Sequence, residues 1–123
     1  MCVLVVSPNE NIASIIRGIL PADQFRLVVV RPGLEFMEAV RREQPEIAVI
    51  HWVHERIDAV QMEIAVLKEV RAEVRIIALS EQSSDCDGSF LEQGVFYYMT
   101  TPPGPELARV IAAARLEISD KER

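Results

Sequence analysis

The sequence predicts an α/β protein with a flavodoxin-like (βα)5 fold, and two patterns lead to this prediction. Short apolar runs rich in β-branched residues recur at intervals of roughly 20 to 25 residues. Segments with apolar residues at helical spacing lie between these runs. Strands that alternate with helices form a parallel sheet with helices on both faces, and five such strands favour the order 2-1-3-4-5.

The five predicted strands are apolar almost throughout, with little alternation between apolar and polar residues. This pattern is typical of strands that are buried on both faces of a parallel sheet. The predicted strands cover residues 2–6, 25–30, 47–50, 74–79 and 95–99.

Four of the intervening segments carry an apolar stripe whose members recur three or four positions apart, as one face of a helix requires. In chain order, the stripes are Ile12, Ile15, Ile16, Ile19 and Leu20; Phe36, Met37 and Val40; Ile57, Val60, Ile64 and Leu67; and Leu107, Val110, Ile111, Ala114 and Ile118. In the third of these helices, Glu63, Lys68 and Arg71 are expected to face away from the stripe. A further helix over residues 85–93 is the weakest prediction, because Gly88 lowers its helix propensity.

Composition limits what the chain can be. It has 123 residues, half of them hydrophobic, so we expect one folded domain. No apolar run is long enough to form a membrane-spanning helix. With 13 Lys and Arg against 19 Asp and Glu, the formal net charge is −6, and the basic footprint of a nucleic-acid-binding domain is missing. The two cysteines, Cys2 and Cys86, show neither metal-ligand nor disulfide spacing, which indicates a reducing, cytoplasmic compartment.

Functional residues are expected just beyond the carboxyl ends of the predicted strands. Open parallel sheets bind ligands there, at the point where the strand order reverses. The candidates that follow or end the strands are Ser7, Pro8, His51, Ser80 and Thr101.

The segments around these candidates resemble motifs of a known family, the receiver domain of bacterial two-component response regulators. The similar segments are VLVVSPN (3–9), PEIAVIHW (45–52), IIALS (76–80) and GVFYYMTTP (94–102). The resemblance covers residues 3–116, and implies a receiver-like domain over residues 1–118 that is followed by a polar C-terminal tail over 119–123.

The chain departs from this family at the positions that carry charge. Family members hold Mg²⁺ with two acidic residues after the first strand, where this chain has Ser7 and Pro8. The phosphoacceptor Asp of the third strand is replaced by His51, and the Lys that precedes a proline is replaced by Thr101. Only the hydroxyl position remains, as Ser80. Phosphoryl transfer depends on such charges and on a metal held by oxygen ligands, so we expect a degenerate pseudo-receiver with no catalytic residue, no metal and no cofactor.

We therefore expect a non-enzymatic module of bacterial signal transduction or transcriptional regulation that acts through protein–protein interaction, independently of aspartyl phosphorylation. One alternative is a small-ligand sensor that uses the vacated pocket between Ser7, His51, Ser80 and Thr101. Another is phosphotransfer through His51. The sequence does not identify the partner, the pathway or the oligomeric state, nor whether an effector domain follows Arg123.

Three roles are considered for His51. It could accept a phosphoryl group as a nucleophile, or bind a metal together with His54. The role that the sequence favours is structural, a neutral and hydrogen-bonded histidine at a strand end. A second local choice concerns the first helix: the segment from Ser7 to Glu10 has the form of a capping box with Ser7 as the N-cap, and Asn9 is the alternative cap.

The resemblance also implies an interaction surface. In the family, the fourth helix, fifth strand and fifth helix commonly mediate dimerisation or partner docking. The corresponding candidates here are Phe96, Tyr97, Tyr98, Arg109, Ala112 and Arg115. Extra packing is the other explanation for the aromatic residues at the sheet edge. We expect a protein partner or a homodimer, and no direct contact of this domain with nucleic acid or a membrane.

Overall fold

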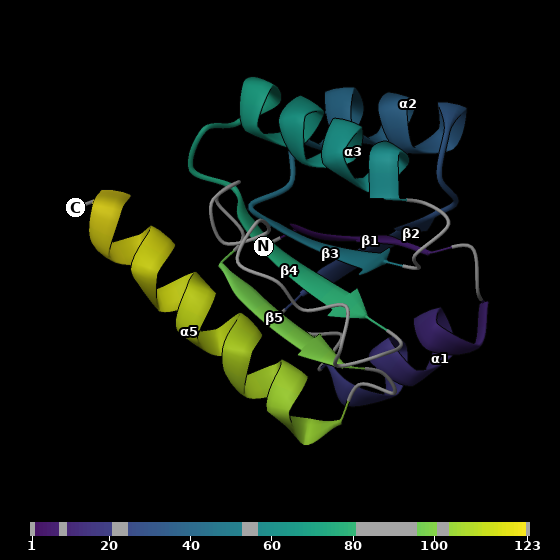
Figure 1. Ribbon diagram of the computed structural model, residues 1–123. Helices are drawn as coiled ribbons and strands as arrows, with labels where there is room; N and C mark the ends of the chain where they lie inside the picture. The colour runs from purple at the N-terminus through teal and green to yellow at the C-terminus, as the bar shows by residue number, and fades with distance from the viewer. Residues whose placement is uncertain are drawn as a thin grey trace.

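The computed structural model describes residues 2–7, 10–20, 25–52, 57–80, 96–100 and 104–122 (Figure 1). Its strands are β1 (Cys2–Val6), β2 (Arg26–Val30), β3 (Ile47–Trp52), β4 (Arg75–Ser80) and β5 (Tyr97–Thr100). They pair in parallel in the order β2-β1-β3-β4-β5. The direction in which strands are added therefore reverses between β1 and β3, which is where parallel sheets of this kind form their functional crevice.

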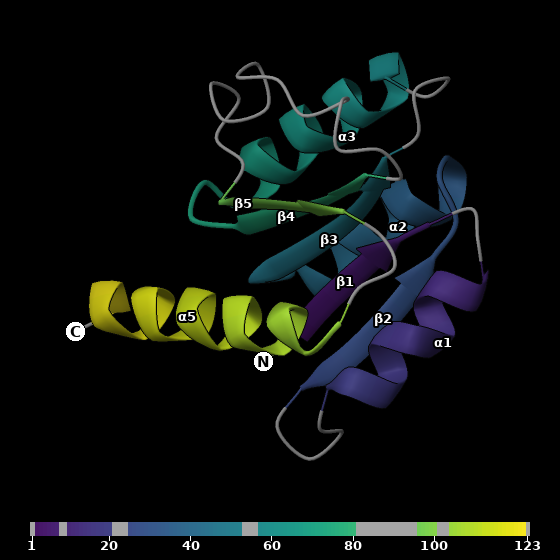
Figure 2. The same cartoon turned by 60° about the horizontal axis from the view of Figure 1, so that its bottom comes forward.

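Helices cover both faces of the sheet. They are α1 (Glu10–Ile19), α2 (Leu34–Glu43), α3 (Ile57–Val70) and α5 (Pro105–Glu122). Helices α2 and α3 lie on one face, and α1 and α5 lie on the other (Figures 1 and 2). Helix α5 continues past Ile118, the expected end of the domain, and its C-terminal part extends beyond the sheet (Figure 2). The predicted helix over 85–93 lies outside the described residues.

Two separate cores arise because neighbouring residues of a strand point to opposite faces. On β1, Leu4 and Val6 pack with α2 and α3, whereas Val3 and Val5 pack with α1 and α5. All five residues of β1 are buried, which explains why its sequence is apolar without alternation. The same division holds on β4, where Ile76 belongs to the first core and Ile77 to the second.

Two predictions about helix faces were wrong. Ile15 has 38% of its surface exposed although it fits the stripe of α1, because Ile12, Ala13, Ile16 and Leu20 already fill the face that meets the sheet. Glu63 on α3 was expected in solvent but is 1% exposed. It lies three positions after Val60 and four before Leu67, so the helical repeat places it on the buried side.

Two backbone positions at the ends of α2 have positive φ angles. Gly33 precedes the helix with a φ of 104°, a value that suits a residue without a Cβ. Gln44 ends the helix in the left-handed conformation, with a φ of 44°, and its N–H donates to the carbonyl oxygen of Val40 at 3.0 Å. This arrangement satisfies a carbonyl group that the helix end would otherwise leave exposed.

Candidate functional site

Ser7 and His51 meet at the reversal point of the sheet. The parallel register pairs Val5 with Val49 and Val6 with Ile50, so the next pair along the strands is Ser7 and His51. Both side chains point to the face covered by α1 and α5, because they continue the alternation of Val5 and Val49. Strand register alone therefore brings the two polar residues together.

The two side chains form a buried hydrogen bond. The Oγ atom of Ser7 lies 3.0 Å from Nδ1 of His51. Ser7 is 5% exposed and His51 is 1% exposed. The hydroxyl donates when Nδ1 is unprotonated and accepts when Nδ1 carries the proton. A second bond holds the end of β1, since the N–H of Ser7 donates to the carbonyl oxygen of Val30 at 3.1 Å.

The polar groups that meet at this corner determine what it can bind. The Ser7–His51 pair offers one hydroxyl and one imidazole, and neither group carries the negative charge of a carboxylate. Mg²⁺ prefers carboxylate and water oxygens. Within the described part of the chain, no three His, Cys, Asp or Glu side chains come together in a way that could hold a metal ion.

The other candidate residues of this corner are only partly described. Ser80 ends β4, and the register pairs it with Trp52, one position beyond His51; its side chain is outside the described part. Pro8 and Thr101 lie outside the described residues, as does His54, the second histidine of the metal-ligand hypothesis. Of the five predicted site residues, the structure thus brings Ser7 and His51 into contact.

The cap of the helix that follows β1 involves residues outside the described part of the chain. Helix α1 is described from Glu10, and Pro8 and Asn9 lie outside the described residues. Ser7 lies at the end of β1, where its hydroxyl meets His51. The choice between Ser7 and Asn9 as the cap of α1 stays a prediction.

The aromatic residues near β5 divide between packing and exposure. Phe96 is half-buried against the core beneath α5, and the guanidinium of Arg75 lies 5.7 Å from its ring centroid. Tyr97 is exposed, and its hydroxyl donates a 2.7 Å hydrogen bond to Oε1 of Glu106 on α5. This bond to a carboxylate raises the pKa of Tyr97, because it holds the phenol proton and because the nearby negative charge disfavours the phenolate.

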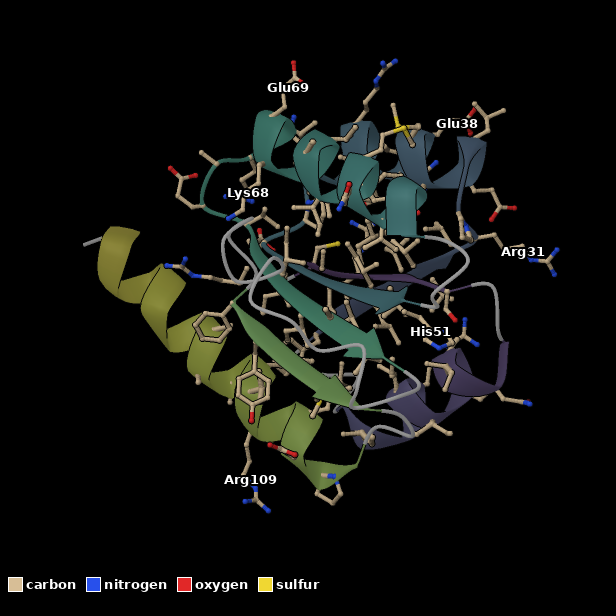
Figure 3. All side chains as sticks on the ribbon, in the orientation of Figure 1. Arg31, Glu38, His51, Lys68, Glu69 and Arg109 are labelled. Atoms are coloured by element: carbon tan, nitrogen blue, oxygen red, sulfur yellow. The ribbon has the colours of Figure 1, made fainter. Side chains whose placement is uncertain are left out.

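Helix α5 presents a surface beside Tyr97. Arg109, Ala112 and Ala113 are exposed, and Arg109 points away from the sheet (Figure 3). Tyr98 belongs to β5 and Arg115 to α5, but their side chains are outside the described part. The exposed residues Tyr97, Glu106, Arg109 and Ala112 are called the β5–α5 surface below.

Cys2 is the cysteine that the structure describes, and it is a buried, free thiol. Burial raises the pKa of this thiol, and the carboxylates of Glu43 and Glu46 raise it further. Since the thiolate is the reactive form, this position is suited to packing and not to redox chemistry. Cys86 lies outside the described residues.

A cavity of about 380 Å³ beside Ser7 was missed by the sequence analysis. Ser14, Arg17, Arg31 and Glu35 line it, whereas His51 does not. Arg31 directly follows β2, so a search beyond the end of every strand would have found it; the second strand was left out of that search. Among the described residues, no helix is long and apolar enough to cross a membrane.

Comparison with known proteins gives a likeness in three dimensions. No protein-family model and no curated protein sequence matches the chain. The receiver domain of AraT, a response regulator from Geobacillus stearothermophilus, is similar with a TM-score of 0.84 and 16% identity over 99% of this chain and 98% of that domain. A CheY-like receiver domain protein from Methanospirillum hungatei has a TM-score of 0.78, 16% identity and the same coverages.

A third similar structure contains a modified site. It is a response regulator protein from Burkholderia pseudomallei with a phosphorylated aspartic acid, a calcium ion and citrate. Its TM-score is 0.74 at 23% identity, over 98% of this chain and 72% of that one. Identities this low establish the architecture and not the activity. The chain therefore has the fold of the receiver domains of response regulators.

Proposed function

We propose that this chain is a receiver-like module of bacterial signal transduction or transcriptional regulation that works through protein contacts and without aspartyl phosphorylation. The fold supports the signalling role. The observation that carries the second part is the buried hydrogen bond between Ser7 and His51. It occupies the positions at which the resembled family has an acidic residue and the phosphoacceptor.

Physical chemistry explains why this pair argues against phosphorylation. An acyl phosphate requires a carboxylate as the acceptor, and its transfer is assisted by metal ions and fixed cations around the phosphoryl oxygens. The residues at the corresponding positions of this chain are Ser7, Pro8, His51 and Thr101, and none of them is a carboxylate or an amine. The protein would then be controlled by association with a partner, not by a covalent switch.

Phosphoryl donors test this proposal directly. The purified chain is incubated with Mg²⁺ and either acetyl phosphate or beryllofluoride, and is followed by intact-mass spectrometry and by amide NMR. We expect no added phosphoryl mass and no saturable shift around His51, while a conventional receiver domain in the same buffers reacts. A phosphoryl adduct on this chain would contradict the proposal, and its loss in a His51→Gln variant would identify the histidine as the acceptor.

The partner would dock on the β5–α5 surface. Tyr97 on β5 and Arg109 and Ala112 on α5 are exposed, and they present an aromatic ring, a positive charge and a small side chain. Arg109→Glu and Ala112→Arg are expected to abolish dimerisation or partner binding without changing the fold, and Arg41→Glu on α2 is the matched surface control. Sedimentation velocity checks this, and equal behaviour of all three variants would exclude the surface.

A further inference from the structure

The cavity beside Ser7 lies at the carboxyl ends of β1 and β2, between α1 and the start of α2. Its volume is about 380 Å³, within the range of roughly 300–1,000 Å³ that is usual for small-ligand sites. Five polar side chains line it together with small apolar side chains of α1 and β2. The polar residues are Ser7, Ser14, Arg17, Arg31 and Glu35.

The polar side chains come from several elements of the fold. Ser14 and Arg17 are three positions apart on α1, which places them on the same side of the helix. Arg31 follows β2 directly, and Figure 3 shows it at the same end of the sheet as His51. Glu35 lies in the first turn of α2, where its Oε2 accepts a 3.0 Å hydrogen bond from the backbone N–H of Arg31. This bond fixes the turn between β2 and α2.

The charge of this cavity is opposite to that of the whole chain. Its lining includes two arginines, Arg17 and Arg31, and one glutamate, Glu35, all of them exposed at the surface, in a protein with a net charge of −6. Arginine presents several N–H donors in a planar fork, which matches the oxygen atoms of carboxylates and phosphates. The hydroxyls of Ser7 and Ser14 add neutral donors of the same kind.

We propose that this cavity binds a small organic oxyanion, a carboxylate or a phosphate monoester that also carries a hydroxyl or amino group. Arg17 and Arg31 bind the anionic group. Glu35 accepts a hydrogen bond from the hydroxyl or amino group through the carboxylate oxygen that the turn does not use. The cavity shares Ser7 with the corner at His51 but is otherwise lined by other residues, and its existence does not depend on the proposed function.

Ser7 links this cavity to the centre of the sheet. It lines the cavity and its hydroxyl also lies 3.0 Å from Nδ1 of His51. An anion that accepts a hydrogen bond from Ser7 competes with His51 for the same hydroxyl. Binding of an anion in the cavity would therefore change the environment of His51 at the end of β3. The NMR resonances of the His51 ring should then shift together with those of the residues that line the cavity.

Titrations with defined anions test the proposal. The probes are inorganic phosphate, glycerol 3-phosphate and malate, each compared with sodium chloride at equal ionic strength, and the readouts are calorimetry and NMR. We expect saturable shifts of the backbone amides of Ser14, Arg17 and Arg31 and of the His51 ring with at least one probe. Phosphates and the carboxylate malate are titrated separately, so the class that binds more tightly identifies the anionic group. If none of the probes gave saturable binding, the proposal would be overturned.

Variants separate a built site from general attraction of anions. Arg17→Gln and Arg31→Gln should each weaken binding about tenfold or more, as expected for the loss of a charge-assisted hydrogen bond. Arg41→Gln removes the same charge from an exposed position outside the cavity and should leave the affinity unchanged. Arg17→Lys keeps the positive charge at this position. Glu35→Gln removes a negative charge that repels an anion, so it should tighten the binding of inorganic phosphate. Equal weakening by Arg17→Gln, Arg31→Gln and Arg41→Gln would overturn the proposal.

Discussion

At the scale of single residues, the Ser7–His51 pair shows how strand register brings two polar side chains together. The parallel pairing of β1 and β3 fixes the positions of both residues. The side chains form a hydrogen bond away from solvent. A buried polar group is stable only when it is hydrogen-bonded, so each residue constrains the identity of the other.

Removal of the serine hydroxyl should therefore be costly. Ser7→Ala takes one partner from a buried imidazole, and we expect the free energy of unfolding to fall by about 1–3 kcal/mol. Urea denaturation measures this change. Ser14→Ala is the control, because Ser14 is exposed and such substitutions usually change stability by about 0.5 kcal/mol or less. If both variants were equally stable, the Ser7–His51 bond would contribute nothing to folding.

At the scale of helices and strands, local geometry determines how the ends of elements are held. Helix α2 is bounded by Gly33 and Gln44, which have positive φ angles. Strand β5 is tied to α5 by the hydrogen bond between Tyr97 and Glu106. The positive φ angle of Gly33 sets the backbone path near the cavity. The Tyr97–Glu106 hydrogen bond holds together the two elements of the β5–α5 surface.

The left-handed residue at the end of α2 offers a stabilising substitution. Gln44 adopts a conformation that glycine reaches without a steric cost. We expect Gln44→Gly to raise the free energy of unfolding by about 0.5–1 kcal/mol, as measured by thermal or urea denaturation. Gln44→Ala keeps the strain and should give no gain. A loss of stability in the glycine variant would show that this end of the helix is not strained.

The Tyr97–Glu106 bond predicts a dependence on alkaline pH. The folded state holds the phenol proton more tightly than the unfolded state, in which a tyrosine has its ordinary pKa of about 10. The stabilisation is therefore fully present below about pH 10 and is lost as the pH rises through the raised pKa of the folded state. Difference absorbance between the wild type and Tyr97→Phe should show a late titration that Glu106→Gln shifts to lower pH. An unchanged titration in Glu106→Gln would contradict this.

At the scale of the whole molecule, one sheet separates two cores. On each central strand, one residue packs against α2 and α3 and the next packs against α1 and α5. Each of these strands therefore contributes side chains to both cores. This layered arrangement gives a stable frame to the elements that carry the β5–α5 surface and the cavity.

Independence of the two cores can be measured with one residue pair. Ile76 and Ile77 are both buried but belong to opposite cores. Ile76→Val and Ile77→Val should each lower the free energy of unfolding by about 0.5–1.5 kcal/mol. We expect the double variant to lose the sum of the two changes, to within about 0.5 kcal/mol. A larger coupling energy from urea denaturation would mean that strain passes through the sheet.

Much of this architecture could be predicted from the spacing of apolar residues, because buried strands are apolar throughout and buried helix faces repeat every three or four residues. All five predicted strands match the observed ones within two residues at each end, and Val60, Ile64 and Leu67 mark the buried side of α3. Periodicity does not reveal exceptions such as the buried Glu63, since its rule assigns charges to solvent. It also does not reveal the cavity, which depends on how α1, β2 and α2 are oriented in space.

The burial of β1 has a consequence for biosynthesis. This strand is made before the other elements of the domain, yet its final neighbours include α5, the last of these elements. Until α5 has been made, the side of β1 that carries Val3 and Val5 is covered only in part, by α1. The nascent chain should therefore bind chaperones that recognise hydrophobic stretches, and its release from them should coincide with the docking of α5.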